Sequence, residues 1–183
     1  EKHNVFSAQL PGGDEYYRAP FLHEYVVSIV SEFHTFINAR FPDAKLSSKL
    51  ASNKLAVCVG DGSSYDKHFD NSGGTDLRKL TVLYYLQTQP WTEDKGGCFR
   101  IYTAQKKDHH SEEEEASQTT AYATRHNDCT EETVYHMDIE PIGDRLLVFW
   151  SDCLVHSVTP SFCPAGEADH RYALTVWITA TDS

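Results

Sequence analysis

Short segments in which apolar and polar side chains alternate dominate this chain after its first fifty residues. They cover 54–59, 67–70, 78–86, 98–102, 134–139, 145–150, 153–158 and 171–179. Alternation with a period of two is typical of β-strands that bury one face, and glycine-rich turns separate several of these segments. Eight or so strands of this length, following one helix, favour a double-sheet jelly roll. We therefore expect a mainly β fold with supporting helices.

An amphipathic helix precedes the predicted strands. Its apolar stripe is made of residues at three- and four-residue steps, namely Leu22, Tyr25, Val26, Ile29, Val30, Phe33, Phe36 and Ile37. Pro42 ends the pattern, so we expect a helix over 21–41 that packs against a sheet. Residues 1–20 contain a proline-glycine-glycine turn signal and are expected to be irregular, with a short strand near Tyr16 and Tyr17.

The chain has 183 residues, a length that suits one compact domain, with the jelly-roll core expected over 54–183. Residues 105–133 interrupt the strand pattern with lysine, histidine, glutamate, serine and threonine. We interpret them as a polar insertion. Histidine and cysteine side chains occur there too, but a solvated loop is favoured over a metal site. Residue 1 is Glu, not Met, as expected of an excised domain.

Charge, hydropathy and cysteine usage limit the partners. The formal net charge is −11 and no cluster of Lys and Arg occurs, so nucleic acid is not an expected partner. No apolar run approaches the ~20 residues that cross a bilayer, so a membrane is not expected either. Five cysteines without a paired spacing are typical of reduced thiols, which favours a cytoplasmic or nuclear location over a disulfide framework.

Three His-x-Asp triplets are candidates for metal binding: 68–70, 126–128 and 136–138. On a strand, residues i and i+2 share a face about 7 Å apart, so both can reach one ion. A chain of this composition should contain about one such triplet by chance, so context must decide. The second triplet lies inside the polar insertion, and the third starts close to the next candidate histidine. We favour His68 and Asp70, which follow a glycine-rich turn and precede most of the predicted sheet.

A third metal ligand must come from a distant strand, and His156 has the apolar neighbours of a strand residue. A histidine buried in the core with its hydrogen bonds satisfied is the competing interpretation. Two imidazoles and one carboxylate on one face of the metal form the ligand set of non-haem Fe(II) oxygenases, which keep other positions open.

Arg171 opens the last predicted strand. Alternation places Arg171 on one face of the strand with Ala173, Thr175 and Trp177. The residues between and after them take the other face, which has the apolar character of a packing face. A guanidinium on a half-buried strand needs an anion, because an unpaired charge there would cost several kcal/mol. Its planar fork matches a carboxylate. A carboxylate from another strand of the protein remains one alternative. A carboxylate-bearing ligand is the other, and the order of triplet, histidine and arginine favours it.

At these residues the chain resembles the prolyl hydroxylase branch of the 2-oxoglutarate oxygenases, whose members hydroxylate hypoxia-inducible factor in animals and Skp1 in protists. The similar stretches are 65–71 (YDKHFDN), 83–86 (LYYL), 96–101 (GGCFRI), 138–141 (DIEP), 144–152 (DRLLVFWSD) and 171–177 (RYALTVW). They occur in family order from about residue 54 to the end. The resemblance implies a double-stranded β-helix core of the jelly-roll or cupin-like kind.

The resemblance also implies cofactors and site residues. The iron(II) ligands it implies are His68, Asp70 and His156. Arg171 would pair with the distal carboxylate of 2-oxoglutarate, helped by the hydroxyls of Tyr85 and Thr175. Phe99 and Trp177 would line the pocket wall. O2 is the second cosubstrate, and ascorbate is expected to support turnover.

For the substrate, the resemblance implies the 4-position of a prolyl residue in a protein, either a Skp1-like or another regulatory protein, with oxygen sensing as the wider role. Tyr65 would lie at the mouth of the site. The substrate would also contact the N-terminal segment at Asp14, Tyr16, Tyr17 and Arg18. Animal relatives carry a cosubstrate-contacting Tyr where this chain has Cys58.

Three other functions remain open at this point. The same oxygenase chemistry can act on another substrate, although the acidic balance disfavours nucleic acid. A zinc-dependent hydrolase can use two histidines and one aspartate with an open water position, but it has no use for Arg171. A non-catalytic jelly-roll binding protein would release no succinate.

Overall fold

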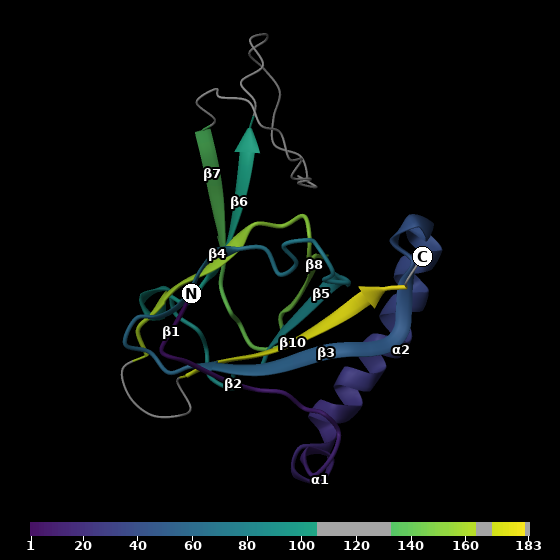
Figure 1. Ribbon diagram of the computed structural model, residues 1–183. Helices are drawn as coiled ribbons and strands as arrows, with labels where there is room; N and C mark the ends of the chain where they lie inside the picture. Colours follow the sequence, from purple (N-terminus) through teal and green to yellow (C-terminus); the bar gives the residue numbers. More distant parts are fainter. Residues whose placement is uncertain (106–132, 164–169, 182–183) are drawn as a thin grey trace.

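The computed structural model describes residues 1–105, 133–163 and 170–181. In this part of the chain, two antiparallel sheets of five strands each form the body of the molecule (Figure 1). One sheet has the order β1 (Lys2–His3), β4 (Ser63–His68), β9 (His156–Ser161), β6 (Phe99–Gln105) and β7 (Thr133–Ile139). The other has the order β2 (Val5–Ala8), β3 (Leu46–Cys58), β10 (Arg171–Ala180), β5 (Arg78–Tyr85) and β8 (Leu146–Trp150). The expected jelly-roll architecture is therefore confirmed.

The main core lies between the second sheet and a long helix. The expected helix over 21–41 is present as α2 (Pro20–Arg40), with Pro20 in its first turn, where a missing N–H costs nothing. Its buried side chains are Val26, Ile29 and Val30. They belong to one apolar cluster with buried residues of β5 and β10, namely Leu80, Val82, Leu174, Val176 and Ile178. Figure 1 shows α2 along the outside of this sheet.

The inward and outward faces of β10 differ as alternation predicts. Leu174, Val176 and Ile178 pack toward the helix. Arg171 and its companions at every second position face away from the helix, toward the first sheet, where they line a pocket. Strand β10 is the central strand of its sheet, paired with β3 on one side and β5 on the other. Its side chains are therefore held on both edges.

Several strand bounds differ from the expected ones. Strand β3 begins at Leu46 rather than at residue 54, and β9 begins at His156 rather than at residue 153. Strand β4 ends at His68, so Asp70 lies two residues beyond the strand and not on it. Its carboxylate is placed by the turn that follows, and strand alternation does not explain its position.

The N-terminal segment is more regular than expected. Residues 2–3 and 5–8 form edge strands β1 and β2, which pair with β4 and β3. The prediction of a short strand near Tyr16 and Tyr17 is wrong, because these residues belong to the helix α1 (Glu15–Arg18). Two short 3-10 helices complete the described structure, η1 (Pro42–Ala44) and η2 (Glu93–Lys95).

The interior of the expected insertion, residues 106–132, lies outside the described residues. Among the residues that the structure describes, no helix has both the length and the apolar character needed to cross a membrane. The described cysteines Cys58, Cys98, Cys153 and Cys163 are free thiols.

Candidate metal site and its pocket

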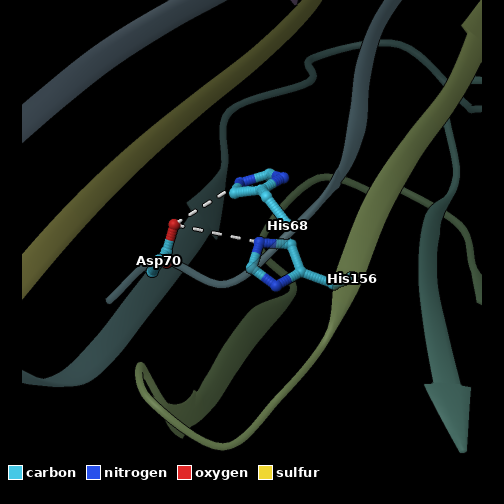
Figure 2. Close-up of side chains that lie close together, drawn as sticks. All are labelled: His68, Asp70 and His156. Atoms are coloured by element: carbon cyan, nitrogen blue, oxygen red, sulfur yellow. Dashed lines mark ion pairs between the residues drawn. The ribbon is translucent and has the colours of Figure 1, made fainter. Parts of the chain in front are cut away.

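Three side chains from the first sheet and the turn after β4 converge on one point (Figure 2). His68 ends β4 and His156 begins β9, and the two residues are register partners across the strand pair. The Nε2 atoms of His68 and His156 lie 3.7 and 3.8 Å from Oδ1 of Asp70. All three ligand atoms are within 4.8 Å of one another. Two imidazoles and one carboxylate thus form a compact set that fits a divalent metal ion.

Backbone carbonyls select the tautomer of both histidines. Nδ1 of His68 lies 2.6 Å from the carbonyl oxygen of Asp66, and Nδ1 of His156 lies 3.1 Å from that of Leu154. Because a carbonyl oxygen only accepts hydrogen bonds, Nδ1 must carry the proton in each ring. The Nε2 atoms, which face Asp70, then keep their lone pairs. This is the orientation that metal-binding histidines adopt.

The Asp70 carboxylate is held ionised by its neighbours. Burial alone would raise the pKa of this carboxyl, but its interactions with His68 and His156, which are ion pairs only when an imidazole is protonated, act in the opposite direction. Oγ1 of Thr81 and Nε1 of Trp177 also donate hydrogen bonds to Oδ2, at 2.8 and 3.1 Å. The net result is a pKa well below its ordinary value. Oδ2 is therefore engaged by the protein, while Oδ1 points to the two imidazoles.

Aromatic rings enclose His156. Its ring lies 4.8 Å from that of Phe99 and 5.0 Å from that of Phe149, centroid to centroid. Burial lowers the pKa of His156, so the imidazole is kept neutral and available as a ligand.

Arg171 is the other charged group of the site, and it is almost completely buried, at 2% exposure. Its Nε donates to the carbonyl of Gly97 at 2.9 Å, and Nη2 donates to the hydroxyl of Tyr85 at 3.1 Å. Nη1 contacts Sγ of Cys58 at 3.8 Å. Gly97 has φ 67°, a conformation suited to glycine. An added Cβ would lie 3.1 Å from Cδ of Arg171, so the second glycine of the 96–97 pair has a local function.

Within the described part of the chain, no carboxylate pairs with Arg171. The protein carboxylate left open by the sequence is not found there, and the partners of the guanidinium are neutral. Burial raises the pKa of Tyr85 and of Cys58, which keeps the phenol and the thiol protonated. A buried guanidinium with neutral partners favours an anionic ligand, because the charge is otherwise uncompensated.

The candidate metal-binding set of His68, Asp70 and His156 opens into the same pocket as Arg171. Its lining residues are Lys54, Ala56, Tyr65, His68, Asp70, Leu83, Phe99, His156, Val158, Arg171, Ala173, Thr175 and Trp177. The four alternate residues of β10 predicted to share a face are all among them. The predicted wall residues Phe99 and Trp177 and the mouth residue Tyr65 line it too. Tyr85 is placed behind Arg171 as its hydrogen-bond partner.

A wider groove adjoins the pocket and shares five of its lining residues. The groove is lined by Lys2, Ser7, Ala8, Gln9, Ser52, Asn53, Lys54, Tyr65, His68, Phe69, Asp70, Ser72, Arg78 and Trp177. The N-terminal segment thus contributes residues of β1 and β2. The predicted substrate-side residues Asp14, Tyr16, Tyr17 and Arg18 lie in or beside α1 and line neither opening. Their contact with substrate stays a prediction.

The His-x-Asp triplet at 136–138 does not form part of this site. His136 and Asp138 lie on β7 with exposed side chains, and the Asp138 carboxylate accepts two hydrogen bonds from Arg100, each 2.6 Å long. Residues 126–128 lie outside the described residues.

Sequence reasoning missed Lys54 and Thr81. Lys54 shares strand alternation with Ala56 and Cys58, which also face the pocket, so a lysine at the centre of this strand was the available signal. Thr81 lies within a run of β-branched and aromatic residues. Nothing in that pattern distinguishes it from a core residue.

Comparisons with known proteins agree with this geometry. The sequence model of the family described as "2OG-Fe(II) oxygenase superfamily" matches residues 54–179. Human "Prolyl hydroxylase EGLN3" is 30% identical over 155 residues, which cover 84% of this chain and 50% of that protein. The "Hypoxia-inducible factor prolyl hydroxylase" of Caenorhabditis elegans is 33% identical over 124 residues, 67% of this chain and 12% of that protein. The chain thus spans half or less of the length of these relatives.

Two solved structures share the fold. A structure of prolyl 4-hydroxylases from Phytophthora capsici superposes with a TM-score of 0.68 at 23% identity, over 96% of this chain and 48% of that one. A prolyl hydroxylase from Trichoplax adhaerens, in complex with a peptide of the oxygen degradation domain of hypoxia inducible factor, gives a TM-score of 0.66 at 26% identity. That match covers 97% of this chain and 63% of the other.

Proposed function

Because the chain belongs to the 2OG-Fe(II) oxygenase superfamily, we propose that it hydroxylates a prolyl residue of a protein, using 2-oxoglutarate and O2 as cosubstrates. His68, Asp70 and His156 would hold the Fe(II) ion. The observation that carries the proposal is the placement of Arg171. A fully buried guanidinium with neutral partners shares one pocket with a set of two imidazoles and one carboxylate.

The residues present fit both the metal and the cosubstrate. The three ligand atoms are close enough to bind one ion, and the Nδ1–H groups of both histidines are already bonded to carbonyls. When bound, Fe(II) with 2-oxoglutarate supplies the activation of O2, and the products are succinate, CO2 and the hydroxylated substrate. The donor set of nitrogen and oxygen atoms suits non-haem iron.

The chain's own residues would orient the cosubstrate and exclude water. Arg171 offers its fork to the distal carboxylate of 2-oxoglutarate, with the hydroxyls of Tyr85 and Thr175 beside it. The apolar wall includes Leu83, Phe99 and Val158. A pocket wall that excludes water strengthens the pairing of guanidinium and carboxylate, because their attraction is less screened than in water. Fixed orientation of bound groups is the main contribution a protein makes to cofactor chemistry.

The choice of a prolyl substrate is supported by the relatives. The curated proteins that match are named prolyl hydroxylases, and one of the similar structures holds a peptide of hypoxia inducible factor. The finer parts of the proposal are oxidation at the 4-position of proline, a regulatory target such as a Skp1-like protein, a role in oxygen sensing, and a cytoplasmic or nuclear location. Their support is the resemblance in sequence. Ascorbate is included as a supporting reductant.

The groove beside the pocket is the proposed binding place of the target peptide. It leads to His68 and Asp70, so a prolyl ring entering from the groove would reach the metal position. The N-terminal segment contributes Lys2 and residues 7–9 to the groove wall. Residues 14–18 extend the proposed substrate contact beyond the groove.

The proposal is tested by incubating the protein with Fe(II), 2-oxoglutarate, ascorbate and a panel of proline-containing peptides, including Skp1-like ones. We expect succinate release and the addition of one oxygen atom to proline, located by tandem mass spectrometry. His156→Ala should abolish both products. Addition of oxygen to another residue type would move the chain to a different oxygenase substrate. Absence of 2-oxoglutarate turnover and binding would favour the zinc hydrolase or the non-catalytic binding protein.

A further inference from the structure

Lys54 occupies the boundary between the pocket and the groove. It lies on β3, where its register partner on β10 is Thr175. Its Nζ atom is 5.1 Å from the ring centroid of Tyr65 and 5.2 Å from that of Trp177. Both rings line the two openings, as does Lys54 itself. The ammonium group is therefore held over the path by which a substrate reaches the metal-ligating residues.

The charge of Lys54 is only partly compensated by the protein. Within the described ranges no hydrogen bond or ion pair to its ammonium occurs, and the two aromatic rings are its direct contacts. Burial, together with the nearby charge of Lys2, lowers the pKa of Lys54 to about 8, even though the charge of the Asp70 carboxylate acts in the opposite direction. Cation–π contacts offset part of this desolvation, but a carboxylate would compensate far more of it.

Basic side chains outnumber acidic ones in the lining of the groove, although acidic residues outnumber basic ones in the whole chain. The lining contains three cations, Lys2, Lys54 and Arg78, and one carboxylate, that of Asp70. Asp70 belongs to the metal-ligating set, and Arg78 is already bonded to Asp76. The chain carries a formal net charge of −11, so this concentration of positive charge is local. Complementary potentials of this kind select and steer an oppositely charged partner.

The cosubstrate does not account for Lys54. On the paired strands, Arg171 is opposite Cys58 and Thr175 is opposite Lys54, so the backbone positions of Arg171 and Lys54 are four residues apart along the strands. That separation is about 13 Å along a strand. A five-carbon dicarboxylate spans roughly half that distance, given ordinary carbon–carbon bond lengths. With one carboxylate at Arg171 and the keto acid end at the candidate metal-binding set, both ends of 2-oxoglutarate have partners without Lys54, so its ammonium is left for another anion.

We propose that Lys54 is a specificity residue that binds an Asp or Glu side chain of the protein substrate, close to the residue that is hydroxylated. The substrate class is therefore an acidic peptide segment. This inference rests on the proposed function for the identity of the ligand as a peptide. It goes beyond that function by naming the charge that the peptide must carry and the group that recognises it.

The test measures peptide binding without turnover. Protein loaded with Mn(II) and 2-oxoglutarate is titrated, without O2, with proline-containing peptides in which one Glu is moved along the positions flanking the proline. Each peptide has a matched Gln version. We expect the peptide with Glu at one of these positions to bind about 10-fold more tightly than its Gln version, a difference of about 1.4 kcal/mol in binding free energy. The preference should shrink as salt is added, because salt screens the pair.

Substitutions at position 54 then locate the preference. Lys54→Met should remove it, and Lys54→Glu should reverse it, so that a Lys peptide binds better than the Glu peptide. A misfolded protein cannot produce this reversal. The control is Lys49→Met, the same substitution at an exposed position of the same strand that lines neither opening. It should keep the preference unchanged.

Three results would overturn the inference. The first is an equal preference for Glu in the wild type and in Lys54→Met. The second is the absence of a preference for Glu at any position. The third is a Lys54→Met variant whose only defect is weaker binding of 2-oxoglutarate. The same peptides, incubated with Fe(II) and O2, separate this inference from the proposed function. If hydroxyproline forms but the protein shows no preference for the charge of the peptide, only the inference about Lys54 is contradicted. A charge preference that depends on Lys54, without hydroxyproline, would contradict the proposed function alone.

Discussion

The indole of Trp177 donates a hydrogen bond to the carboxylate of Asp70, with 3.1 Å between Nε1 and Oδ2. Trp177 lies on β10, six residues after Arg171, whereas Asp70 follows the end of β4 in the other sheet. One strand therefore carries the guanidinium and also orients the carboxylate of the candidate metal site. Because β10 is the central strand of its sheet, the two parts of the site are fixed relative to each other.

Removing either donor to Asp70 should weaken metal binding. We expect Thr81→Val and Trp177→Phe each to lower the affinity for Mn(II) by about 10-fold, since partners behind a ligand typically contribute 10–100-fold. Isothermal titration measures the effect. Trp150→Phe removes an indole that packs against the apolar core under α2, and it should leave the affinity unchanged. Unchanged affinity in both site variants would contradict the orienting role assigned to these two donors.

The choice between the His-x-Asp triplets can be tested directly. His156→Ala should reduce Mn(II) affinity at least 100-fold, because one of three protein ligands is lost. His136→Ala removes an exposed imidazole from a rival triplet and should bind the metal as the wild type does. Metal loss in the His136 variant, with retention in the His156 variant, would place the site on β7.

The fork of Arg171 should matter beyond its charge. We expect Arg171→Ala to weaken 2-oxoglutarate binding about 100-fold, and Arg171→Lys at least 10-fold, because lysine cannot donate two parallel hydrogen bonds to a carboxylate. Titration of the Mn(II)-loaded protein without O2 gives both values. Arg100→Lys, at an exposed ion pair with Asp138, is the matched control. Full affinity in Arg171→Lys would show that the charge alone suffices.

The opposite face of β10 should determine stability and not binding. Leu174 is fully buried in the cluster under α2, so Leu174→Ala should lower the free energy of unfolding by about 2–5 kcal/mol. Val27→Ala, at a half-exposed position of the helix, should change it by less than about 0.5 kcal/mol. Urea unfolding measures both. A small effect at Leu174 would contradict the assignment of this face to the core.

The sequence was sufficient for the parts of the site that lie on regular central strands. Alternation on β10 placed Arg171 and Thr175 on the pocket face and Leu174 on the core face, and the structure agrees. This succeeded because a central strand has neighbours on both edges, so its pleat is regular over its whole length. The apolar stripe of α2 was predicted for the same reason, since one repeat continues over many residues.

Features that depend on tertiary neighbours were not predicted. Asp70 was expected on the strand of His68, but the strand ends first and hydrogen bonds from Thr81 and Trp177 fix the carboxylate. Edge strands β1 and β2 are too short to show a periodic pattern. Lys54 was missed because an isolated lysine in a strand is usually solvated. Its placement between two rings depends on residues distant in sequence.

The central claim is that the metal triad and Arg171 bind the two ends of one ligand. The most direct measurement is the affinity of 2-oxoglutarate, by titration without O2, for the protein with and without bound Mn(II). We predict one-to-one binding with the metal and an affinity at least about 100-fold lower without it, because half of the contacts of the ligand are then lost. Equal affinity with and without the metal would contradict the account.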